Sequence, residues 1–183
     1  MNEYKTTNSF SFTRFYYRRV KRLLPSFFLT AVFVFILGFL LLSPSDFISL
    51  TNSIFSGSIA LSNFYFLGEA GYFDTTAKLK PMLHTWSLSI EEQYYFIWPL
   101  TLYILLRFFR RFKTSWLILG LTIIAIAATW YVNAFGVAES ILAFFSNKPD
   151  STTDLQSLLF FLLPFRSYEF LLGALLVFIP EIR

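Results

Sequence analysis

The segment 81–99, PMLHTWSLSIEEQYYFIWP, carries the side chains best suited to chemistry. It contains the only histidine of the chain, His84, and two adjacent carboxylates, Glu91 and Glu92. An imidazole can give or take a proton near neutral pH, and a carboxylate can assist it. His84 lies seven and eight residues before the two glutamates, so an acid–base pairing is sterically allowed but is not required by the spacing. We treat His84, Glu91 and Glu92 as candidate catalytic residues.

The acidic pair also has a structural interpretation. Ser89 and Glu92 match the S-x-x-E pattern of a capping box, with both glutamates near the positive end of a helix dipole. From the residues alone, capping is favoured over catalysis. On a helix, however, Glu91, Tyr95 and Trp98 would share one face, and a carboxylate at membrane depth beside aromatic rings is a functional candidate.

Two arginines near the N-terminus form a second candidate site. Arg19 and Arg22 would share a helical face at i, i+3, and two guanidinium groups side by side can bind phosphates. A basic segment in front of an apolar run more commonly holds the chain to an anionic inner leaflet. The residues alone favour this anchoring role.

A third polar feature lies within an apolar run near the C-terminus. Arg166 and Glu169 are i, i+3 neighbours, and an unpaired charge in such a run costs roughly 2.5 to 3.5 kcal/mol on insertion scales. We expect the two side chains to pair within a polar cavity of a helical bundle. The alternative is that Pro164 starts the helix and Arg166 reaches the outer interface.

The composition indicates an all-α integral membrane protein. Of 183 residues, 56% are hydrophobic and 14% charged, with a mean hydropathy of +0.59, whereas soluble domains have about 25% charged residues. The absence of Cys excludes a thiolate nucleophile, and one His argues against a zinc site, so we expect neither a metal nor a bound cofactor. Basic residues cluster beside apolar runs, so the net charge of +4 reflects membrane topology and not nucleic-acid binding.

These elements must be positioned by membrane helices. We expect a bundle of about four transmembrane helices forming one membrane domain over 1–183, with spans at 25–42, 92–109, 115–136 and 158–180. An external loop, 43–91, includes the uncharged but polar stretch 47–68, which we interpret as re-entrant or interfacial. The distribution of Lys and Arg predicts a cytoplasmic N-terminus in a multi-pass protein of the plasma or inner membrane.

Four segments occur in an order that is similar to a known family: RFYYRRVKRLLP at 14–25, SNFYFLGEAGYFD at 62–74, LHTWSLSIEEQYYFIWP at 83–99 and RSYEFLLGALL at 166–176. This order resembles acyltransferase family 3, the membrane O-acyltransferases of the bacterial O-antigen and peptidoglycan acetylase type. The resemblance extends over nearly all of the chain, and the 83–99 block is its most specific part.

The resemblance implies transfer of an acyl group, commonly acetyl, from cytoplasmic acyl-coenzyme A to hydroxyls of envelope saccharides. The R-x-x-R motif of the family is matched by Arg19 and Arg22, which are therefore expected to meet the phosphates of the donor. The block with His84, Glu91 and Glu92 matches a family segment near the outer face, where the saccharide acceptor should approach. The partners implied are the lipid bilayer, acyl-coenzyme A and the saccharide.

The sequence also departs from the family pattern. Family members begin with two further spans, one of which carries a His regarded as the catalytic base, and their membrane domain continues past the position of Arg183. The chain therefore resembles a part truncated at both ends, expected to be inactive alone and to need a complementing N-terminal or C-terminal polypeptide. The alternative is a non-enzymatic membrane module, such as a decayed gene product or an accessory subunit of saccharide export.

Overall fold

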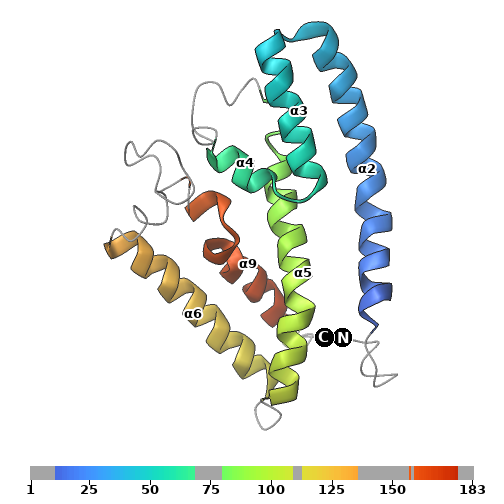
Figure 1. Cartoon of the computed structure of the whole chain (residues 1–183). Coiled ribbons are helices and arrows are strands. Elements are labelled where there is room, and N and C mark those ends of the chain that lie inside the picture. The colour runs from blue at the N-terminus through green and yellow to red at the C-terminus, as the bar shows by residue number, and fades with distance from the viewer. Residues whose placement is uncertain (1–10, 69–79, 109–112, 136–156, 158, 177–183) are drawn as a thin grey trace, which may run out of the picture. The chain divides into compact units, whose positions relative to one another are not determined.

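The computed structural model describes residues 11–68, 80–108, 113–135, 157 and 159–176 (Figure 1). Every element in these residues is helical: α2 (Phe12–Leu41), α3 (Pro44–Ser58), α4 (Ser62–Gly68), α5 (Thr85–Phe108), α6 (Thr114–Phe135) and α9 (Leu163–Leu176). The all-helical fold expected from the sequence is confirmed for this part of the chain. The chain divides into two compact units, 1–48 and 49–183, and each is described by itself.

The first unit is dominated by α2, a single helix of 30 residues. The Ser11 hydroxyl caps it by accepting from the backbone N–H of Arg14 at 3.3 Å. Pro25 lies inside the helix, where its missing N–H is tolerated because the flanking turns continue to pair. The basic segment and the apolar run are therefore one helix, which begins well before the boundary at residue 25 that the sequence suggests.

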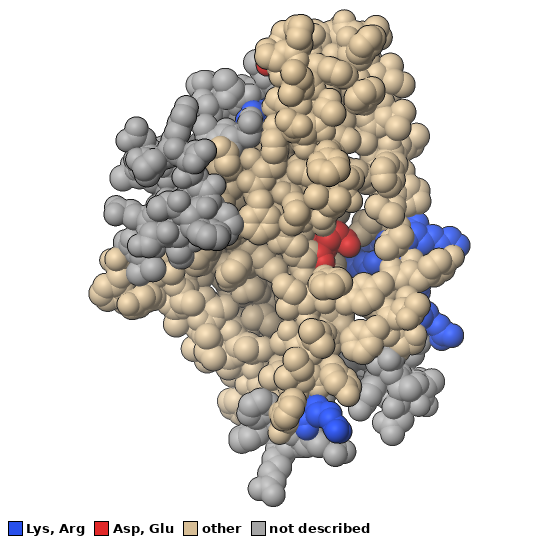
Figure 2. Space-filling model, in the orientation of Figure 1, with Lys and Arg blue, Asp and Glu red and all other residues tan. Residues whose placement is uncertain are grey.

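Two of the described helices, α2 and α6, are long and apolar enough to cross a membrane, judged by length and composition. Large apolar side chains on them are exposed, including Leu29 at 75% and Phe39 at 71%. On the face drawn in Figure 2, uncharged residues make up almost all of the described surface. Large exposed apolar side chains on long helices are typical of helices that meet lipid or other helices.

The other two expected spans differ from these. Helix α5 begins at Thr85, not at 92, and includes two glutamates and Arg107. Helix α9 begins at Leu163, with Pro164 in its first turn, where proline is favoured. Residues 159–161 of the expected span are helical as well and are separated from α9 by a break at Leu162. The 14 described residues of α9 extend about 21 Å, and residues 177–183 lie outside the described part.

In the second unit α9 lies between α6 and α5 (Figure 1). The apolar core lies at the end of the unit where α5 and α9 begin and α6 ends. Its buried members are Phe66, Leu67, Leu83, Val132, Phe161, Leu162 and Phe165. Because α4 supplies two of these side chains and Trp86 of α5 packs against the cluster, the core joins α4 to α5, α6 and α9.

The stretch 47–68, expected to be re-entrant or interfacial, contains most of α3 and all of α4. The two helices are separated at Ala60, whose φ of 56° lies in the left-handed region that non-glycine residues seldom occupy. The Ala60 carbonyl accepts a hydrogen bond from Gln93 Nε2 at 2.8 Å, which holds this joint on α5. Ser49 and Tyr65 also join α3 to α4 through their hydroxyls, 3.0 Å apart. The placement of this stretch relative to a membrane stays a prediction.

Candidate functional site

The candidate catalytic residues lie at the start of α5. A turn at 81–84 leads directly into the helix, with Thr85 N–H donating to the Met82 carbonyl at 3.0 Å. Ser89 therefore lies inside α5 and does not cap it, so the capping-box interpretation of Ser89 and Glu92 is wrong. The physical reason is a tertiary contact, because the Ser89 hydroxyl is bonded to α4.

One side of α5 is fixed to α4 by buried polar contacts. The Ser62 and Ser89 hydroxyls are 2.7 Å apart, and the Ser62 N–H donates to Ser89 Oγ at 3.2 Å. Gln93 Nε2 donates to Asn63 Oδ1 at 2.8 Å, and Asn63 Nδ2 donates to the Phe161 carbonyl at 3.0 Å. Ser62 and Asn63 are fully buried. A buried network in which the polar groups are hydrogen-bonded to one another favours a single arrangement of the helices that it joins.

This network could hardly be predicted from the sequence. Asn63 and Ser62 belong to the block SNFYFLGEAGYFD, which carried part of the family resemblance, but no partner is near them in the chain. Ser62 and Ser89 are separated by 27 positions, and Asn63 and Phe161 by 98. The polar character of the stretch 47–68, to which both residues belong, was the available signal.

A second side of α5 packs on α9 and on the residues just before it through aromatic rings. The centroid of Trp86 lies 4.2 Å from that of Phe160 and 5.5 Å from that of Phe161. Two turns further along, the Tyr94 ring stacks on Phe170 of α9 at 4.6 Å. The first three turns of α5 are thus held from two directions.

The candidate acid–base residues lie in the turn before α5 and on one face of its first turns. Helical spacing puts Ser87 and Glu91 on one face, which is bordered by Tyr94, three residues after Glu91, where Tyr94 stacks on Phe170 of α9. His84 and Ser87 are exposed, and Glu91 is half-buried. Ser87 Oγ donates to the His84 carbonyl at 3.1 Å, so the turn that carries His84 continues into this face.

His84 and Glu91 are not brought into direct contact. Glu91 lies six residues after the start of α5 at Thr85, about 9 Å along the helix axis, and His84 lies in the turn before that start. Glu92, also half-buried, points about 100° away from Glu91 around the helix axis. The arrangement suits a substrate that reaches along the helix from His84 to Glu91.

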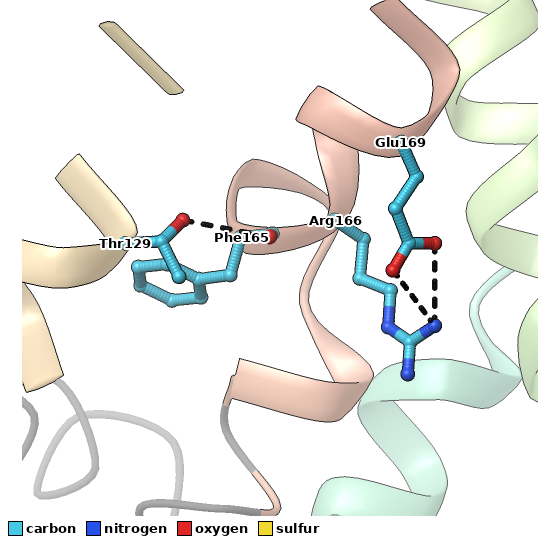
Figure 3. A network of polar contacts seen from close by, with 4 residues as sticks. All are labelled: Thr129, Phe165, Arg166 and Glu169. Carbon is cyan, nitrogen blue, oxygen red and sulfur yellow. Dashed lines mark hydrogen bonds and ion pairs between the residues drawn. The ribbon is translucent and has the colours of Figure 1, made fainter. Parts of the chain in front are cut away.

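Arg166 and Glu169 pair on α9, as Figure 3 shows. Arg166 Nη1 lies 3.3 Å from both carboxylate oxygens of Glu169. The two side chains are 27% and 44% exposed. The guanidinium carbon also lies 5.3 Å from the centroid of the Trp86 ring and 4.6 Å from that of Phe160. The depth of this pair in a membrane stays a prediction.

The candidate donor-binding residues belong to the first unit. Arg19 and Arg22 lie on α2 one turn apart, with Arg19 half-buried and Arg22 exposed. Their role in binding a phosphate stays a prediction. Within the described residues, no cluster of three or more His, Asp or Glu side chains could hold a metal ion.

Comparison with known proteins gives this site a context. A family model described as "Acyltransferase domain" matches residues 4–181. The chain is 39% identical over 127 residues to an uncharacterized protein of Haemophilus influenzae, covering 69% of this chain and 52% of that protein. It is 33% identical over 129 residues to the O-acetyltransferase OatA of Staphylococcus aureus (strain NCTC 8325), covering 69% of this chain and 20% of that protein. The chain therefore spans about half of the first relative and less of the second, and no solved structure matches it.

Proposed function

Because the chain belongs to this acyltransferase family, whose members are integral to membranes, we propose that it forms part of a membrane O-acyltransferase. The acyl group, most simply acetyl, passes from acyl-coenzyme A to a hydroxyl of a cell-envelope saccharide. The name of the Staphylococcus relative supports transfer of an acetyl group to oxygen. The donor and the acceptor are inferred from the family resemblance of the motifs described above.

The observation that carries this proposal is the exposed turn and the helix face at the start of α5. His84 is exposed in the turn before the helix, and Glu91 follows it on a half-buried face next to Tyr94, which packs on α9. An exposed imidazole and a half-buried carboxylate can hydrogen-bond the hydroxyls of a sugar that lies along this face. We assign His84, Glu91 and Glu92 to the acceptor side of the reaction.

The reaction requires that a base remove the proton of the acceptor hydroxyl as its oxygen attacks the thioester carbonyl. A C–O bond forms, the C–S bond breaks, and coenzyme A leaves as a thiol after taking up a proton. Acid–base groups contribute about 10² to 10⁴ in rate to such steps, provided that they lie within hydrogen-bond reach. His84 is the only imidazole of the chain. If His84 binds the acceptor without deprotonating it, the base is Glu91, Glu92 or a group on a complementing polypeptide.

The proposed topology puts the donor and acceptor pools on opposite sides of the membrane, so the thioester and the acceptor hydroxyl must meet within the helical bundle for the attack to occur. Four spans, at about 25–42, 92–109, 115–136 and 158–180, put the N-terminus in the cytoplasm of a plasma or inner membrane protein. Arg19 and Arg22 then face the cytoplasmic pool of acyl-coenzyme A, whose phosphates suit guanidinium groups. The 43–91 segment, with His84 at its end, then faces outward.

The test is acyl transfer in proteoliposomes. The full chain is reconstituted with acetyl-coenzyme A labelled in its acetyl group and with envelope saccharides, alone or co-expressed with the part of the Haemophilus relative that the match leaves uncovered. We expect base-labile label on the saccharide only in the complemented sample. Robust transfer by the chain alone, abolished by His84→Ala, would show that the base lies in this chain. Absence of transfer in both samples would favour the non-enzymatic membrane module.

A further inference from the structure

We propose that Arg166 is a positioning residue that holds the first turn of α5, and with it the His84 turn, against α9. Its partners are Trp86, Phe160 and Glu169, and the four residues together are called the Arg166 clamp. The inference rests on the proposed function only in that the His84 turn is taken as the acceptor side. The contacts themselves do not depend on the reaction.

The clamp combines three kinds of contact around one planar group. The guanidinium carbon of Arg166 lies within 5.3 Å of the Trp86 centroid and 4.6 Å of the Phe160 centroid, both in the range of cation–π attraction. The carboxylate of Glu169 accepts from one nitrogen at 3.3 Å and compensates the charge. The two rings also contact each other, with centroids 4.2 Å apart. A single side chain thus joins α9, the segment before α9 and α5.

The contact with Trp86 reaches His84 because the intervening backbone is bonded as one unit. The Trp86 N–H donates to the Leu83 carbonyl at 3.2 Å, and the Leu83 N–H donates to the Lys80 carbonyl at 3.0 Å. The Leu83 side chain is buried in the same core cluster as Phe161. A shift of Trp86 must therefore move the turn in which His84 lies.

The other end of the clamp rests on a well-packed helix. Helix α9 packs along α6, and Thr129 Oγ1 of α6 lies 3.5 Å from the Phe165 carbonyl, next to Arg166 in the chain (Figure 3). Phe165 itself is buried in the core. Because α9 is held against α6, the contact of Arg166 with Trp86 fixes the start of α5 relative to both helices.

The shape of the arginine side chain is essential to this role. A guanidinium group is planar and stacks on aromatic rings, whereas the ammonium group of lysine is a compact, strongly hydrated charge. Arg166→Lys keeps the positive charge opposite Glu169 and removes the planar contact with both rings. Glu169→Gln does the reverse, because it removes the ion pair and leaves the rings and the guanidinium in place.

The single histidine of the chain provides a direct readout that needs no activity. With ¹⁵N-labelled histidine, the reconstituted full chain gives one set of imidazole resonances, from His84. We expect one sharp set in the wild type and broadened or multiple sets in Arg166→Lys, with a smaller change in Glu169→Gln. Arg107→Lys is the matched control, because Arg107 is exposed at the opposite end of α5, and it should leave the resonances unchanged.

In the complemented enzyme, Arg166→Lys should lower kcat for saccharide acylation by about 10- to 100-fold, the effect expected of a small misplacement, while the KM for the acyl donor stays within about twofold. Trp86→Phe changes the same contact from the side of α5 and should disturb the same His84 resonances. Agreement between the two variants would show that the effect does not come from a folding defect of Arg166→Lys alone. The double variant should be little worse than Arg166→Lys alone, because the two changes remove one contact.

The two proposals fail in different ways. A single unperturbed His84 resonance in Arg166→Lys would overturn the clamp, whatever the activity. An equal drop in donor affinity and turnover would also overturn it, because positioning of the acceptor side does not change donor binding. Perturbed resonances without acyl transfer in any sample would leave the clamp standing and refute the proposed function.

Discussion

Replacement of Asn63 by alanine should destabilise the second unit more than any exposed polar substitution. Asn63 is 0% exposed and makes two hydrogen bonds, donating to the Phe161 carbonyl at 3.0 Å and accepting from Gln93 Nε2 at 2.8 Å. The substitution removes both and leaves a small cavity where the carboxamide was. Gln93 Nε2 keeps its hydrogen bond to the Ala60 carbonyl, so the Gln93 amide still has a partner in the variant.

The expected magnitude follows from these two bonds. Depriving a buried carbonyl of its donor costs about 1 to 3 kcal/mol, and loss of an ordinary hydrogen bond about 0.5 to 1.5 kcal/mol. Interhelical hydrogen bonds in membrane proteins average only about 0.6 kcal/mol, because the unfolded chain in the membrane also finds partners. The cost of Asn63→Ala should therefore lie between about 1 and 4 kcal/mol, nearer the upper value because the site is packed among core side chains.

Reversible unfolding in mixed detergent micelles measures this cost. Asn52→Ala is the matched control, since Asn52 is exposed on α3 in the same unit, and it should change stability by less than about 0.5 kcal/mol. A cycle with Gln93→Ala should give a coupling energy of about 0.5 kcal/mol or more. Equal stabilities of the Asn63 and Asn52 variants, or zero coupling, would refute the view that Asn63 joins α4, α5 and the segment before α9.

Three further predictions address the helix joint, the topology and the donor site. Ser89→Ala removes two buried contacts with Ser62 and should cost about 1 to 3 kcal/mol by the same unfolding assay; no loss would show that the joint does not need it. Lys113→Cys, the only thiol in such a chain, should react with an impermeant maleimide from the cytoplasmic side, and labelling from outside would overturn the four-span topology. In the complemented enzyme, replacing Arg19 and Arg22 together by Lys should raise the KM for acyl-coenzyme A by about tenfold with unchanged insertion, since Lys lacks the planar fork; an unchanged KM would leave them an anchoring role only.

The sequence predicted the helical class because that class depends on the length and continuity of apolar runs. Helix α6, expected at 115–136, is described as Thr114–Phe135 because its run has no internal charge or proline. Helix α5 was harder, since Ser89 and Glu92 imitate a helix start. Its true start at Thr85 depends on the turn before it and on a hydroxyl contact with Ser62.

The candidate site was predictable where its chemistry is local in sequence. His84, Glu91 and Glu92 stand out by residue type, and the pairing of Arg166 with Glu169 follows from i, i+3 spacing on a helix. The stacking of Arg166 on Trp86 could not be inferred, because the two residues are distant in the chain and no periodic pattern connects them. Contacts of this kind arise only after the helices have packed.

The length of α2 constrains how it meets a bilayer. Its 30 residues extend about 45 Å, whereas the hydrocarbon layer is about 30 Å thick. Burying the whole helix in hydrocarbon would require a tilt of about 48°, outside the range of 0 to 40° found for transmembrane helices. An α2 that crosses a bilayer must therefore project in part as a helical stalk, and the end that carries Arg14, Arg18 and Arg22 is the one suited to water and headgroups. A negatively charged molecule would then meet these side chains on a preformed rod beyond the hydrocarbon, without any arginine having to enter the lipid.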